Sequence, residues 1–159
     1  MKTRFILLVA LFAFVSTTVS AQFYNRKKVA ITEVVDKSAD HDISEGTKTF
    51  VRSALTDAIT NSEGYEGYTS ISFISLEANF DTTGNLSSAT LNYVKKQMME
   101  YILVATITPL DKRTVLLEAR IVRTSDGKIV TSSSVRTSDN IDALRPACNT
   151  LACKLVGAI

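Results

Sequence analysis

The chain has 159 residues, of which 45% are hydrophobic and 21% charged, with six glycines, two prolines and no tryptophan. This composition is that of an ordinary globular domain and excludes a disordered tail, a collagen-like repeat and a coiled coil. Its 18 basic and 16 acidic residues give a formal charge of +2, without the basic excess that marks nucleic-acid-binding proteins. We therefore expect no nucleic-acid partner.

The first 21 residues have the layout of a secretory signal peptide. Lys2 and Arg4 precede an apolar run of about 11 residues, and Val19-Ser20-Ala21 gives a small-residue cleavage site. The run is too short to span a membrane, which takes about 20 apolar residues. No cysteine lies near the site to accept a lipid. We predict cleavage after Ala21, a periplasmic or secreted protein without a membrane span, and a single domain over residues 22–159.

The first half of that domain reads as strand, helix and strand. The β-branched run Lys28–Val35 predicts a strand, and the apolar spacing within Ile43–Thr60 predicts an amphipathic helix. Asp42 and Glu45 have the spacing of an N-cap and its reciprocal carboxylate. A second strand is expected at Tyr68–Phe73, and the less clear segment 74–85 could hold one helical turn at 76–80.

The second half predicts a helix, three strands and a closing helix. The helix covers Ser87–Met99, and the apolar run Tyr101–Ile107 indicates a central strand that is buried on both faces. Thr114–Arg123 and Lys128–Arg136 form a hairpin around Ser125-Asp126-Gly127. The last helix begins near Asp139 and continues through Pro146; its apolar stripe consists of Ile141, Leu144, Cys148, Leu151, Ala152 and Leu155.

The order β-α-β-(α)α-β-β-β-α predicts an α/β (α+β) fold. Crossover connections come first and an antiparallel meander follows, so we expect a mixed sheet with helices packed against one face. The chain should end in an antiparallel hairpin and a C-terminal amphipathic helix.

Several of these segments resemble the family that groups the TolB amino-terminal domain, the curli secretion protein CsgG and the penicillin-binding-protein activator LpoB. The stretches that carry the resemblance are KVAITEVVDKS, FVRSALTDAITNSEGY, VKKQMMEYILVATITP, LLEARIVRTSDGKIVTSSS and LRPACNTLACKLVG. The match is best at Tyr101–Val104 and Asp126–Val130. The resemblance implies an exported adaptor domain of the cell envelope. The lipid-accepting cysteine of the family's lipoproteins is missing, so membrane anchoring does not carry over.

His41, the only histidine, lies between Asp40 and Asp42 after the first predicted strand. This arrangement could serve a metal or acid–base site, but no second histidine or cysteine pair completes a ligand set. A solvated loop is the favoured interpretation. The sequence also contains no nucleophile elbow and no glycine-rich phosphate loop. We expect no cofactor, no metal and no enzymatic activity.

Cys148 and Cys153 are five residues apart on the last predicted helix. That spacing separates their side chains by about 140° around the helix and places the Cα atoms too far apart for a bridge. Two free thiols are therefore predicted, with Cys148 in the apolar stripe. The alternatives are a disulfide in an unwound helix and a reactive or intermolecular Cys153.

Four residues are candidates for partner binding. Glu118 and Arg120 lie on the polar face of the predicted hairpin, and Tyr65 and Tyr68 lie near glycines. A solvated face and a capped sheet edge are the corresponding structural interpretations. The sequence predicts a non-enzymatic protein-binding module whose partner is another exported or envelope protein. The alternatives are an accessory subunit of a CsgG-like secretion or surface assembly and a small hydrolase.

Overall fold

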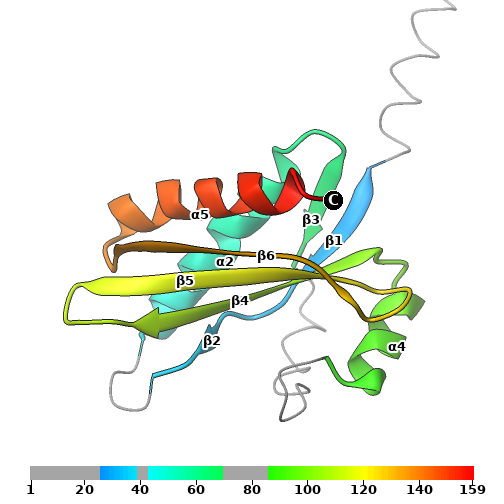
Figure 1. The fold of residues 1–159 in the computed structure, drawn as a ribbon, viewed down its shortest axis with the longest axis horizontal. Helices are drawn as coiled ribbons and strands as arrows, with labels where there is room; N and C mark the ends of the chain where they lie inside the picture. Colours follow the sequence, from blue (N-terminus) through cyan, green and yellow to red (C-terminus); the bar gives the residue numbers. More distant parts are fainter. Residues whose placement is uncertain (1–25, 39–42, 70–85) are drawn as a thin grey trace, which may run out of the picture.

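The fold is a mixed sheet with helices on both faces (Figure 1). The computed structural model describes residues 26–38, 43–69 and 86–159. The predicted signal peptide and cleavage site, His41, Asp42 and the segment 74–85 lie outside these residues, as does most of the strand predicted at Tyr68–Phe73.

The sheet has the order β3-β1-β4-β5-β6, with β2 also paired to β4. Strand β4 runs parallel to β1, β2 lies parallel to β4, and the β4-β5-β6 meander is antiparallel. This confirms the predicted mixed sheet. The elements are β1 (Lys27–Ile31), β2 (Val35–Asp36), α2 (Glu45–Thr60), β3 (Tyr65–Tyr68), α4 (Ser88–Lys96), β4 (Tyr101–Pro109), β5 (Thr114–Arg123), β6 (Ile129–Ser138) and α5 (Ile141–Val156).

The main core lies between the sheet and helices α2 and α5. Alternate residues of β5 point into it, from Val115 to Ile121, as the sequence predicts. Helix α4 packs on the opposite face, where Val94 covers Ile102 and Val104 of β4. The expectation of helices against one face therefore fails for α4. Both faces of β4 are apolar at this end of the strand, so each requires a helix.

The first predicted strand is interrupted. β1 ends at Ile31, whose carbonyl accepts a hydrogen bond from the Arg52 guanidinium at 3.2 Å. The chain then rejoins β4 as β2, and one extra residue on this side shifts the pairing from Ile31↔Leu103 to Val35↔Thr106. Because Lys28–Val35 is rich in β-branched residues throughout, the sequence predicts one continuous strand there and does not indicate this irregularity.

Helix α5 contains both cysteines as free thiols, which confirms the prediction. Cys148 is fully buried and its thiol lies 4.0 Å from the Val51 carbonyl oxygen of α2, whereas Cys153 is exposed. Burial raises the pKa of the Cys148 thiol to about 11. The predicted apolar stripe is correct except for Ile141, which is 58% exposed because it lies at the very start of the helix, next to the N-cap Asn140.

We predict that Gly67→Ala destabilises the fold. A Cβ at Gly67 would lie 2.8 Å from the Ile31 side chain and 3.0 Å from the Thr56 carbonyl oxygen, so β3 would have to move away from α2. Overpacking of this kind costs about 1–3 kcal/mol. Gly46→Ala is the control, because its Cβ would meet only the Ser44 hydroxyl, at 3.8 Å. Urea unfolding that gives Gly67→Ala the stability of the wild type would contradict the prediction.

Cys148→Ser should also destabilise the protein, by about 1–3 kcal/mol, because it places a smaller and more polar group in a tightly packed site, where the nearby Val51 carbonyl oxygen is 4.0 Å from the native sulfur. Cys153→Ser should leave the unfolding free energy unchanged. In the native protein at pH 8, a thiol reagent should label Cys153 alone, and it should label both cysteines after denaturation without reductant. A monomer with no free thiol would refute this assignment.

Candidate functional site

Among the helices that the structure describes, α4 alone packs on the second face of the sheet, and it covers this face only at one end. On this face, alternate residues of β4 change from apolar to polar along the strand, from Ile102 and Val104 to Thr106. The same face of β5 carries Glu118 and Arg120, and that of β6 carries Ser132 and Ser134. Small hydroxyl side chains on the outer strand leave the longer side chains of β5 accessible.

Strand register arranges these side chains in two cross-strand rows. Thr106, Glu118 and Ser134 form one row, and Val104, Arg120 and Ser132 form the other. Lys37, just after β2, adds a positive charge beside the first row. We call this surface the polar sheet face. It is hollowed into a shallow concavity of about 410 Å³.

Lys37 and Glu118 of the polar sheet face form a loose ion pair. The Lys37 ammonium lies 3.5 Å from the Glu118 carboxylate, which also accepts a hydrogen bond from the Thr106 hydroxyl at 3.4 Å. The Lys37 and Glu118 side chains are 54% and 42% exposed. Ion pairs as exposed as this contribute little to folding, typically below about 1 kcal/mol. A binding partner could replace the contact at small cost.

The two predicted tyrosines are placed differently. Tyr65 is only 7% exposed and packs into the main core, so its ring is not available to a partner. Tyr68 is half-buried and has the Lys28 ammonium 5.8 Å from its ring centre. Burial, together with the Glu66 carboxylate, raises the pKa of Tyr68. Strands β1 and β4 separate both tyrosines from Glu118 and Arg120.

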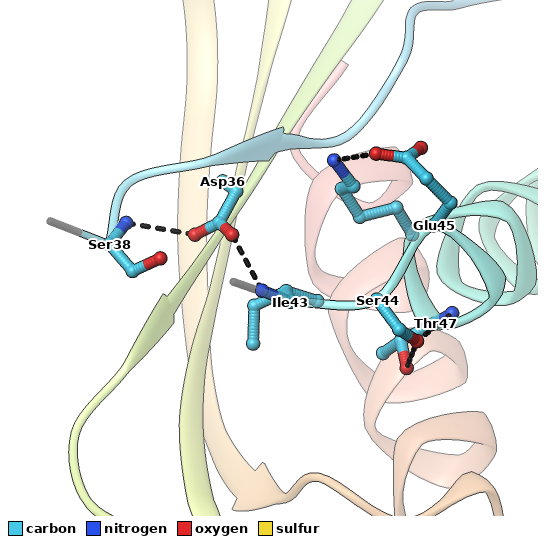
Figure 2. A network of polar contacts seen from close by, with 7 residues as sticks. Asp36, Ser38, Ile43, Ser44, Glu45 and Thr47 are labelled. Carbon is cyan, nitrogen blue, oxygen red and sulfur yellow. Dashed lines mark hydrogen bonds and ion pairs between the residues drawn. The ribbon is translucent and has the colours of Figure 1, made fainter. Parts of the chain in front are cut away.

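A second polar cluster holds the start of α2 (Figure 2). The Asp36 carboxylate accepts hydrogen bonds from the backbone N–H groups of Ser38 and Ile43, at 2.8 and 2.7 Å. Ser44 is the N-cap, because its hydroxyl accepts a hydrogen bond from the Thr47 N–H at 3.1 Å. The predicted cap at Asp42 is therefore wrong. Glu45 forms an ion pair with Lys48 in place of the reciprocal capping contact.

Among the described residues, no three His, Cys, Asp or Glu side chains come together as a possible metal site. In the same part of the chain, no helix is both long enough and apolar enough to cross a membrane.

No model of a known protein family matches the sequence, and no curated protein does. Solved structures do share the fold. The PelC dodecamer from Paraburkholderia phytofirmans matches 85% of this chain and 88% of its own, with a TM-score of 0.56 and 11% identity. The LpoB C-terminal domain from Escherichia coli matches 70% of this chain and 82% of its own, with a TM-score of 0.53 and 12% identity. TolB from Acinetobacter baumannii matches 84% of this chain but only 28% of its own length, with a TM-score of 0.54 and 7% identity.

We predict that Asp36 stabilises the fold only while it is ionised. Burial pushes its pKa up, but the hydrogen bonds from Ser38 and Ile43 and the nearby Lys48 outweigh burial, so the pKa lies below its usual value. A carboxyl with a lowered folded pKa stabilises the protein above its unfolded pKa of about 3.9, and this contribution is lost as the pH falls through the folded pKa. Asp36→Asn should therefore lower the free energy of unfolding by about 1–2 kcal/mol at pH 7.

The difference between Asp36→Asn and the wild type should shrink as the pH falls below about 4. Thermal melts of both proteins between pH 7 and pH 2.5 measure it. Asp57→Asn, on the exposed side of α2, is the control. A difference between Asp36→Asn and wild type that is the same at every pH would show that the charge is not what stabilises the loop.

Proposed function

We propose that the protein is a non-enzymatic binding module of the cell envelope, exported to the periplasm or beyond, which captures another envelope protein. The polar sheet face carries this proposal. It offers Lys37, Glu118 and Arg120 with hydroxyl groups around a shallow concavity. Shallow surfaces with mixed charges suit a protein partner better than a small substrate, which usually needs an enclosed pocket.

The fold supports the same proposal. LpoB and TolB share this architecture, and the family that the sequence resembles includes adaptor domains. The predicted signal peptide would export the chain to the cell envelope, where the proposed partner lies. Tyr65 is no longer part of the proposed contact surface because it is buried.

A second candidate function is that of an accessory subunit in a larger envelope assembly. The observation that favours it is the similarity of this chain to a protein whose solved structure is a dodecamer. Native mass spectrometry distinguishes the two candidates, since a subunit of such an oligomer should give one large, defined stoichiometry without any other protein.

Glu118→Arg combined with Arg120→Glu should weaken partner capture at least tenfold, because the change reverses both charges and leaves the net charge unaltered. Asp57→Lys with Arg145→Glu is the matched control, since both residues are exposed on helices over the other face and the new charges suit the helix ends on which they lie. Capture is measured by crosslinking in cells and quantitative mass spectrometry. Tyr68→Ala should have a smaller effect.

A photoreactive amino acid at Arg120 should crosslink the same partner, whereas one at Ser53 on α2 should not. Full capture by the charge-reversed variant would show that the polar sheet face is not the binding surface. A turnover that His41→Ala abolishes would refute the non-enzymatic proposal altogether.

A further inference from the structure

Strand β6 forms one border of the sheet. It is ten residues long and pairs with β5 on one side. Within residues 26–38, 43–69 and 86–159, no strand pairs with its other side. Border strands of this length are usually protected by proline, by charged side chains or by bulges. β6 has no proline, its one charged residue is Arg136 near its end, and its one irregularity lies at its start, opposite Ile121 and Val122. The stretch from Thr131 to Val135 therefore carries none of these features.

We propose that β6 pairs antiparallel with β6 of a second copy of this chain, so that the sheet continues across a twofold axis. The strand is suited to this pairing because most of its residues from Thr131 to Ser138 carry small hydroxyl side chains. Its one charged residue is Arg136. A formal charge of only +2 for the whole chain adds little long-range repulsion between copies.

Charge complementarity selects the register. A twofold axis perpendicular to the sheet pairs residues that share a face. With Val135 on the axis, the paired segment covers residues 132–138, and Arg136 of the second copy lies opposite Ser134. The row that contains Ser134 continues to Glu118 on β5, so a guanidinium can reach the Glu118 carboxylate across the small serine. Two strand spacings are about 10 Å, which the two long side chains can bridge together.

The neighbouring registers are less favourable. With Ser134 on the axis, Arg136 of the second copy lies opposite Ser132, in the row that contains Arg120 of the same charge. With Ser133 on the axis, it lies opposite Val130 and meets no acid. Within one copy, Arg136 has a loose contact with Asp111, at 3.8 Å between side chains that are 67% and 54% exposed. That contact can be exchanged at little cost.

Sedimentation equilibrium of the purified protein between about 1 µM and about 1 mM tests the dimer, since one strand pair is a small interface and should bind weakly. Ser134→Lys should weaken dimerisation at least about tenfold, because it places two like charges beside the two Arg136 side chains. Ser53→Lys is the matched control on exposed α2 surface and should dimerise like the wild type. Circular dichroism melts verify that both variants fold.

Charge exchange tests the register. Glu118→Arg and Arg136→Glu should each weaken the dimer, and the double variant should recover it. Val135→Cys in a Cys153→Ser background should form a disulfide-linked dimer on mild oxidation, whereas Ser53→Cys in the same background should not.

A protein that stays monomeric at every concentration overturns the proposal. So does a dimer that Ser134→Lys leaves intact and Val135→Cys fails to crosslink. These measurements use the protein alone, so their outcome is independent of whether the polar sheet face captures another envelope protein.

Discussion

The structure depends on β4, a strand that must be covered on both faces. Leu103, Ala105 and Ile107 are buried against α2 and α5, and Ile102 and Val104 against α4. Beyond Val104 the second face becomes polar, starting with Thr106. Helix α4 covers only the apolar part, and the polar remainder of β4, β5 and β6 is left as the concave surface. The position of the candidate site thus follows from where one strand stops being apolar.

Elements whose structure is determined by local periodicity could be predicted from the sequence. The two arms of the hairpin alternate regularly around Ser125-Asp126-Gly127, and β5 has the predicted bounds, Thr114–Arg123. Gly127 has a φ of +72°, which explains the glycine in that turn. The buried position of Cys148 likewise follows from helical spacing, because the residues three and four positions away, Leu144, Leu151 and Ala152, are all apolar and buried.

Features that depend on contacts between distant segments could not be predicted in this way. The interruption after Ile31 is accompanied by a hydrogen bond from Arg52, 21 residues further along, and the local sequence indicates neither the interruption nor this contact. Asp42 has the spacing of an N-cap, but the helix begins at Glu45 and Ser44 is its N-cap. The Asp36 carboxylate holds Ile43, the residue before Ser44, through a hydrogen bond from the Ile43 N–H. Helix α4 packs on the second face of the sheet because Ile102 and Val104 of β4 make that face apolar. This choice depends on a strand that follows α4 in the chain, so the sequence of the helix alone does not indicate it.

The candidate site combines both kinds of feature. Glu118 and Arg120 could be recognised because they alternate with core residues on one strand. Lys37, Thr106, Ser132 and Ser134 could be assigned to the site only when the register of four strands was known. Of the predicted tyrosines, Tyr65 has the aromatic character of a binding residue, yet it fills the core beside Val29 and Ile59. An aromatic ring near glycines does not by itself distinguish a binding anchor from a core residue.

The serines of β6 link the two proposed surfaces physically. Because Ser132 and Ser134 are small, they leave the concavity open on one side and the strand border unobstructed on the other. A second copy paired to β6 would place its Arg136 in the row of Glu118, and Glu118 is also the acidic group available to a partner on the polar sheet face. The two binding events therefore share a charged group.

By thermodynamic reciprocity, a partner that binds Glu118 would weaken the pairing of two copies by the same factor by which that pairing weakens the capture of the partner. Binding of the partner would then displace the second copy. Bulkier residues on β6 would remove this competition, because they would obstruct both the polar sheet face and the border of the strand.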